Sequence, residues 1–186
     1  IGGTTGIPNG SAAVDIYVHD TYYVVGHFHY TLFPVTFFGM FTGIYFWFPK
    51  MFGRMMNEAL GKLHFWITTI SFNAVFIPML LLGAAGHHRR IADPRGFPLL
   101  EPVQYLHVIA TWATIALLLG QIPFIFNFFY SMFKGPVAER NPWLANSLEW
   151  AAPSPPGHGN FDQPIAVYRG PYEYSQPNAS SDFLPQ

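Results

Sequence analysis

Three long stretches without a formal charge constrain this chain more than any other feature of its sequence. They cover residues 21–49, 63–86 and 102–133. A helix needs about 20 predominantly apolar residues to cross the core of a bilayer, and each stretch is longer than that. Three buried helices of a soluble protein are the alternative, but helices of globular domains carry a polar face that these stretches lack. The sequence therefore predicts an all-α integral membrane protein with three transmembrane helices.

The composition agrees with lipid as the solvent and excludes some kinds of site. Hydrophobic residues make up 51% and charged residues 10%, against about 25% charged residues in typical soluble proteins. A net charge of −1 gives nucleic-acid binding no electrostatic support. With no cysteine, any metal site must use histidine, carboxylate or backbone ligands. The chain opens on a Gly-rich segment, so we expect no signal peptide.

Charges in the connecting segments predict how the helices are oriented. Loop 50–62 and the segment after residue 133 share five basic residues: Lys50, Arg54, Lys62, Lys134 and Arg140. The loop at the opposite ends of the spans, residues 87–101, has three: Arg89, Arg90 and Arg95. The positive-inside rule then predicts that loop 50–62 and tail 134–186 are cytoplasmic and that loops 1–20 and 87–101 face outward. The tail is rich in Pro, Gly, Ser and Asn, which predicts an extended segment.

Two histidines stand inside the first apolar stretch. His27 and His29 are two residues apart, which on an α-helix separates their side chains by about 200°. Because ionisable groups in a span are costly, they are candidates for a functional site. A regular helix cannot bring both to one metal ion, but it could give one ligand to each of two macrocycles on opposite sides. The alternative is a pair of hydrogen-bonded histidines that join helices.

Four motifs carry a resemblance to a known family. They are HDTYYVVGHFHY, followed by FPK; a second span that opens on KLHFW; an arginine pair at the far end of that span; and the tail segment NPWLANSLEWAAPSPPGHGNF. This pattern resembles subunit I of the haem-copper oxidases, and the tail is similar to bacterial members. The resemblance covers nearly the whole chain but only the last quarter to third of the family's subunit. It implies that the three helices are part of a twelve-helix subunit.

The resemblance implies roles for the central motif. His27 would be the proximal ligand of the high-spin haem at the oxygen-reducing site, and His29 an axial ligand of the low-spin haem. Phe28 would lie between the two haems. One imidazole ligand leaves the other face of an iron open, whereas two close it and suit it to electron transfer.

The resemblance also assigns polar residues at the outer ends of the spans. His19 and Asp20 would contribute to a Mg or Mn site shared with subunit II, although Asp20 could instead cap the helix. Tyr22 is a possible haem contact. Arg89 and Arg90 would bind the haem propionates, and an interfacial basic anchor is the alternative.

Other polar residues have simpler expectations. His87-His88 stands where the family usually has Met-Pro, which leaves the conformation of the propionate loop open. His64 and His107 lie near span ends and are expected to be interfacial or hydrogen-bonded histidines rather than metal ligands. Asn73 and Gln121 are expected to bond across helices.

By this resemblance the chain is part of the catalytic subunit of a respiratory terminal oxidase. Such an enzyme reduces oxygen to water with electrons from cytochrome c and pumps protons. Two haems, of the haem a type, a copper centre with ligands outside this chain, and Mg or Mn are the implied cofactors. The implied partners are the rest of subunit I, subunits II and III, cytochrome c or a similar donor, and lipids of a bacterial inner membrane. A quinol oxidase, a nitric oxide reductase and a non-catalytic haem or structural subunit are the alternatives.

Overall fold

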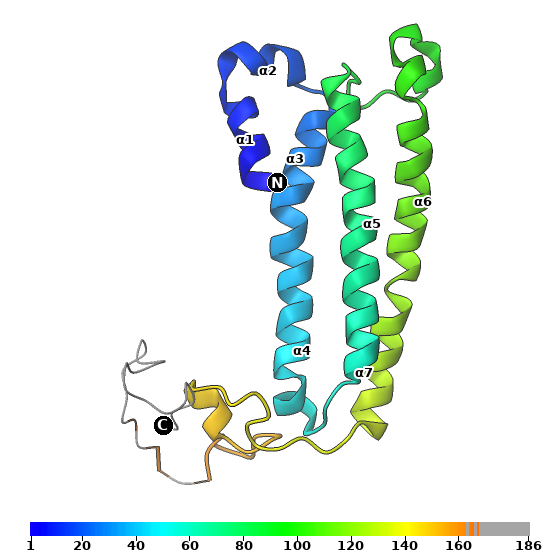
Figure 1. Cartoon of the computed structure of the whole chain (residues 1–186). Coiled ribbons are helices and arrows are strands. Elements are labelled where there is room, and N and C mark those ends of the chain that lie inside the picture. The colour runs from blue at the N-terminus through cyan, green and yellow to red at the C-terminus, as the bar shows by residue number, and fades with distance from the viewer. Residues whose placement is uncertain (163, 166, 168–186) are drawn as a thin grey trace, which may run out of the picture. The chain divides into compact units, whose positions relative to one another are not determined.

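The structure, a computed structural model, describes residues 1–162, 164, 165 and 167. Their regular elements are helical, without a β-strand: α1 (Gly2–Gly10), α2 (Ala12–Val18), α3 (Tyr22–Phe33), α4 (Gly39–Phe52), α5 (Glu58–Ala84), α6 (Tyr105–Leu119) and α7 (Ile122–Lys134) (Figure 1). Within the described residues, three helical segments are long and apolar enough to span a membrane: Tyr22–Phe52, Glu58–Ala84 and Tyr105–Lys134. The prediction of an all-α membrane protein with three spans is confirmed. The last part of the predicted tail lies outside the described residues.

Two of the spans contain an irregular turn. Pro34 has no backbone N–H and its ring crowds the preceding turn, and residues Pro34–Phe38 form a wider π-helical turn between α3 and α4. In the third span α6 ends at Leu119 and α7 starts at Ile122. Pro123 lies in the first turn of α7, where a missing N–H costs nothing.

The chain divides into two compact units, which are described separately. The first comprises residues 1–41 and 59–125. Its core contains Tyr30, Phe72, Val75, Phe76 and Ala113, from α3, α5 and α6. Helices α3 and α5 approach closely at two glycines: a Cβ on Gly26 would lie 2.9 Å from the Leu80 side chain, and one on Gly83 would overlap the backbone of Tyr23. Small residues at a crossing allow this approach in membrane helices.

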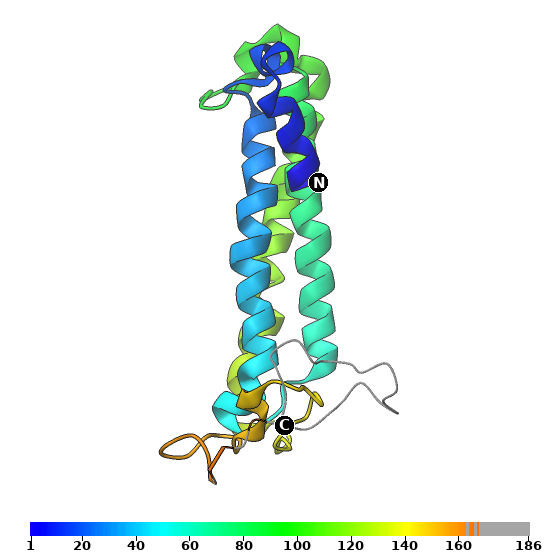
Figure 2. The ribbon, with the colours of Figure 1, turned by 90° about the vertical axis from the view of Figure 1, so that its left-hand side faces the viewer.

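Segment 1–20, which precedes the first span, is itself helical. α1 packs along α3, and α2 leads from α1 to the start of α3 (Figures 1 and 2). Residues 87–103 form a loop with two short 3₁₀ turns, Pro94–Gly96 and Pro98–Val103. Segment 1–20 thus lies against His27 of α3, and the start of the loop is hydrogen-bonded to Asp20 and Tyr22.

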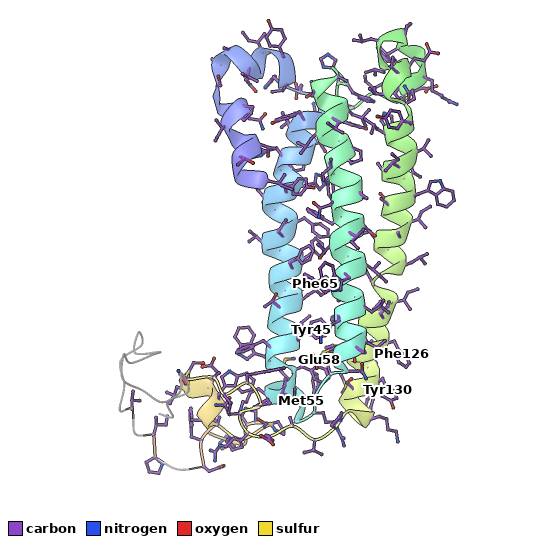
Figure 3. The ribbon with its side chains drawn as sticks, in the orientation of Figure 1. Tyr45, Met55, Glu58, Phe65, Phe126 and Tyr130 are labelled. Atoms are coloured by element: carbon purple, nitrogen blue, oxygen red, sulfur yellow. The ribbon has the colours of Figure 1, made fainter. Side chains whose placement is uncertain are left out.

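The second unit comprises residues 42–58 and the chain from Phe126 onward. Lys50 is buried, and its ammonium donates hydrogen bonds to the carbonyls of Arg140 (3.0 Å), Ala152 (2.6 Å) and Pro153 (3.3 Å). It also lies 5.0 Å from the ring centroid of buried Trp150. The first part of the tail is therefore fixed to the end of α4. On α7, Phe126 and Tyr130 stack on an exposed face (Figure 3).

Candidate functional site

The His27 imidazole projects from α3 toward α1. Its Nδ1 lies 3.0 Å from the Thr5 hydroxyl oxygen. A Cβ on Gly6 would lie 3.1 Å from His27 Cε1, so the α1 backbone passes directly against the ring. The sequence did not indicate either α1 residue. Thr5 is separated by 22 positions from His27, so the sequence carries no local signal of this contact.

The His29 imidazole faces another neighbour. Its Nδ1 lies 2.8 Å from the carbonyl oxygen of Val25, one turn earlier in α3. The ring stacks on Phe76 of α5 at 4.4 Å between centroids and 17° between planes. Phe28 lies on the ring at 4.6 Å and 29°. The aromatic contacts and the hydrogen bond together fix the orientation of this imidazole.

These hydrogen bonds leave both histidines suited to metal binding. A backbone carbonyl only accepts, so His29 Nδ1 carries the proton and Nε2 keeps its lone pair. In the described part of the chain each ring makes its hydrogen bond through Nδ1. Metal-binding histidines usually donate their second N–H to an oxygen in this way. Since His27 contacts α1 and His29 contacts α5, the two rings face different neighbours, as the spacing predicts.

His19 and Asp20 lie just before α3. His19 Nε2 is 3.8 Å from Asp20 Oδ2, and its Nδ1 is 3.5 Å from Asp15 Oδ2. Asp20 adopts a left-handed backbone conformation, with φ of 53°. The described residues contain no group of three or more His, Cys, Asp or Glu side chains placed to hold a metal ion. A cation bound by His19 and Asp20 would therefore need further ligands from elsewhere.

Thr21, rather than Asp20, caps α3. The Thr21 side chain accepts a hydrogen bond from the Tyr23 backbone N–H at 3.2 Å. The alternative role for Asp20 as the helix cap was therefore wrong, because the N-cap position falls one residue later. The Asp20 carboxylate instead pairs with the Arg89 guanidinium, and the Asp20 carbonyl accepts from the Arg89 backbone N–H at 2.9 Å.

The two arginines in the loop after α5 have different surroundings. Arg89 is partly buried, and its Nε is a buried donor with no hydrogen-bond partner among the described residues. A carboxylate ligand would satisfy that donor, since guanidinium binds carboxylates with two parallel hydrogen bonds. Arg90 is exposed, with φ of 67°. Arg95 pairs with Asp93, and this hydrogen-bonded pair holds the pKa of the Asp93 carboxyl below its usual value.

A ring cluster beside the arginines was not expected from the sequence. His87 is 1% exposed, stacks on Tyr22 at 4.3 Å and 12°, and lies 4.8 Å from the His107 ring. Its Nδ1 is 2.7 Å from the His88 carbonyl oxygen. Tyr22, the possible haem contact, is thus packed against His87 of the loop after α5 and His107 of α6. The departure from Met-Pro at His87-His88 was the only hint of this cluster.

The hydrogen bonds expected of His64, Gln121 and Asn73 are confirmed, whereas the Nε2 of His107 is buried without a hydrogen-bond partner among the described residues. His64 Nε2 lies 3.0 Å from Gln121 Oε1, and the Gln121 amide also donates to Thr68 at 3.2 Å. Tyr30 donates to Asn73 Oδ1 at 2.8 Å. These polar side chains have a structural role within the first unit.

Comparison with known proteins gives one consistent result. Residues 1–145 match the family described as Cytochrome C and Quinol oxidase polypeptide I. The chain is 49% identical over 176 residues to cytochrome c oxidase subunit 1 of Synechocystis sp., covering 94% of this chain and 31% of that protein. It is 47% identical to cytochrome c oxidase subunit 1 of Thermostichus vulcanus, with the same coverage.

A third relative is the alternative cytochrome c oxidase subunit 1 of Bradyrhizobium diazoefficiens. It is 39% identical over 188 residues, covering 100% of this chain and 32% of that protein. This chain spans about a third of the length of these curated relatives. The resemblance carried by the HDTYYVVGHFHY motif is confirmed, and the chain belongs to the cytochrome c and quinol oxidase polypeptide I family, the subunit I family of the haem-copper oxidases.

Proposed function

We propose that this chain supplies one ligand to each of two haems in the catalytic subunit of a respiratory terminal oxidase. His27 ligates the high-spin haem iron at the oxygen-reducing site, and His29 ligates the low-spin haem iron. The complete enzyme reduces oxygen to water with electrons from cytochrome c and couples this to proton pumping. The haems, which we take to be of the haem a type, and the copper centre supply the redox chemistry when bound.

One observation carries the proposal. The two imidazoles lie on one helix, face different neighbours, and each has Nδ1 engaged with an oxygen of the chain. Each Nε2 lone pair is therefore available to an iron on its own side of α3. A pair of histidines that only joined helices would be expected to use both nitrogens for bonds within the protein, as polar groups in a bilayer require partners.

The neighbouring residues then have defined tasks. Phe28 follows His27 and stacks on His29, so it lies on the short path between the two ligands. Phe76 stacks on the His29 ring and restricts its orientation. His29 Nδ1 donates to Val25, which increases the basicity of the coordinating nitrogen.

At the outer ends of the spans, charged residues would bind the acidic groups and a hard cation. The unpartnered Nε of Arg89 supports a role for Arg89, together with Arg90, in binding the haem propionates. His19 and Asp20 would supply two ligands of a Mg or Mn site, completed by subunit II and water. Asp20 pairs with Arg89, so the cation site and the propionate site would share one charge network.

The partners follow from the same proposal. The rest of subunit I would provide the second histidine of the low-spin haem and the copper ligands, and subunits II and III would complete the assembly. We place the protein in a bacterial inner membrane with the tail in the cytoplasm. A quinol oxidase is the second candidate, because the matching family includes both donors by its description; the relatives named as cytochrome c oxidases favour cytochrome c.

A difference spectrum of the purified complex tests the proposal. Reduced-minus-oxidised spectra, with and without carbon monoxide, should show two haem populations, only one of which responds to carbon monoxide. In His27→Ala the responsive population should be lost, and in His29→Ala the low-spin band should be lost. His88→Ala changes an exposed histidine and should retain both.

Two results would overturn this assignment. Low-spin haem without a carbon monoxide response would make the chain part of an electron-transfer cytochrome. Wild-type spectra in both alanine variants would mean that neither histidine binds haem. Oxidation of ubiquinol but not of cytochrome c by the intact complex would instead establish the quinol oxidase.

A further inference from the structure

We infer that Thr5 is a positioning residue. Its hydroxyl accepts a hydrogen bond from His27 Nδ1 and thereby influences the strength of the iron–histidine bond and the midpoint potential of the haem that His27 ligates. The inference rests on the proposed function, because it takes His27 as an axial ligand. It adds a residue from α1, a segment that contributes no ligand of its own.

The hydrogen bonds of Thr5 define the direction of the proton. Its hydroxyl oxygen lies 3.0 Å from the Ile1 carbonyl oxygen, 3.0 Å from the Gly2 carbonyl oxygen and 3.0 Å from His27 Nδ1. A hydroxyl has one proton to donate and lone pairs that accept. Because carbonyl oxygens only accept, that proton points back into α1 and a lone pair faces His27. His27 Nδ1 is then the donor, and Nε2 keeps the lone pair that binds iron.

Close packing of α1 on α3 holds Thr5 and His27 in contact. A Cβ on Gly6 would lie 3.1 Å from His27 Cε1, and one on Gly2 would lie 2.8 Å from the Tyr30 carbonyl oxygen. Gly2 and Gly6, one on each side of Thr5 in the sequence, thus allow the α1 backbone to lie against Tyr30 and His27 of α3. The α1 backbone restricts rotation of the His27 ring. The Thr5 hydroxyl then fixes the orientation of the ring and keeps its proton on Nδ1.

The two ligands therefore differ in what supports them. His29 donates to a backbone carbonyl of its own helix, whereas His27 donates to a side-chain hydroxyl from another helix. Loss of an oxygen partner makes an imidazole a weaker donor to the metal, and such changes typically alter metal affinity by 10–100-fold. A weaker axial donor favours the ferrous state. A tenfold change in the ratio of ferrous to ferric affinity corresponds to about 59 mV in a one-electron potential.

Substitution of Thr5 in the assembled complex tests the inference. Thr5→Val keeps the shape and removes the hydroxyl, whereas Thr5→Ser keeps the hydroxyl. We expect Thr5→Val to lower the iron–histidine stretching frequency of the reduced high-spin haem in resonance Raman spectra and to raise its midpoint potential. Thr5→Ser should match the wild type, and the low-spin haem should not change in either variant.

A matched control is next to Thr5 in the sequence. The Thr4 hydroxyl also donates to the Ile1 carbonyl, at 2.9 Å, but no hydrogen bond joins it to His27 among the described residues. Thr4→Val should leave the stretching frequency and the potential unchanged. A shift of equal size in Thr4→Val would attribute the effect to α1 stability and overturn the inference.

The remaining outcomes separate this inference from the proposed function. If Thr5→Val leaves the stretching frequency and the potential at wild-type values while both haems are present, the inference is wrong and the ligand assignment stands. If His27→Ala retains a carbon monoxide-responsive haem, the ligand assignment itself fails. Should Thr5→Val not assemble, Thr5→Ala removes the hydroxyl without adding bulk and must show the same two shifts.

Discussion

Tyr30 and Asn73 join α3 to α5 through a 2.8 Å hydrogen bond from the tyrosine hydroxyl to the amide oxygen. Tyr30 directly follows His29, and its ring also packs on Phe72, 4.9 Å between centroids. The Asn73 amide donates in turn to the Thr69 carbonyl at 2.9 Å. The helix that carries both candidate ligands is thus fixed to its neighbour one residue beyond the second of them.

Tyr30→Phe should destabilise the complex modestly. It keeps the ring packing and leaves Asn73 Oδ1 without its donor, which costs about 1 kcal/mol. The midpoint of thermal loss of the haem absorbance in detergent should fall. Tyr17 is 77% exposed, so Tyr17→Phe should leave the midpoint unchanged. An equal midpoint for Tyr30→Phe and the wild type would show that the bond adds no stability.

Gly83→Ala should prevent α3 and α5 from packing. The new methyl group would overlap the Tyr23 backbone, which cannot move as a flexible side chain can. We expect poor assembly or a loss of more than about 3 kcal/mol, in the upper range for overpacking. Size-exclusion chromatography and haem content of the purified complex measure this.

Gly3→Ala provides the matched control for that substitution, because nothing lies within 4 Å of a Cβ at Gly3. It should assemble normally with full haem content. Normal assembly of Gly83→Ala as well would mean that the two helices are further apart than the structure places them.

Lys50→Met should release the first part of the tail. Its ammonium donates to three carbonyls, and methionine would remove all three hydrogen bonds. Hydrogen bonds to charged groups contribute about 1.5–3 kcal/mol each, so we expect a loss of at least about 2 kcal/mol. Limited proteolysis should cut between residues 135 and 155 faster than in the wild type. Lys134→Met, at an exposed position, should leave the cleavage rate unchanged.

His87→Ala should be far more damaging than His88→Ala. His87 is 1% exposed and fills the space against Tyr22, so its loss leaves a cavity worth about 2–3 kcal/mol. His88 is exposed. The thermal midpoint of the complex in detergent is the measurement, and a larger fall for His88→Ala would contradict the burial of His87 against Tyr22.

Several features of this protein follow from the sequence by itself. Uncharged stretches longer than a bilayer crossing predict the three spans, because lipid tolerates few exposed polar groups. The two-residue interval between His27 and His29 predicts that they face different neighbours, because helix periodicity is local and fixed. The family follows from a motif of twelve adjacent residues, His19–Tyr30, and so needs no knowledge of distant contacts.

The sequence does not decide which of two neighbouring residues caps a helix when both are suitable. Asp20 and Thr21 are both suitable N-cap residues. The structure assigns the cap to Thr21 and leaves the Asp20 carboxylate to Arg89. The ion pair with a residue of a different loop helps decide which of two adjacent side chains turns toward the helix.

Only the tertiary structure decided which side chains support the candidate ligands and which ones pack or form hydrogen bonds at the ends of the spans. Thr5 meets His27 across 22 positions, and Lys50 meets the Ala152 carbonyl across 102. His87 reaches Tyr22 and His107 because α3, α5 and α6 bring three separate segments together. Such contacts depend on where glycines allow helices to approach and on which way each chain reversal turns. Packing determines both over the whole fold, and no local pattern of residues encodes them.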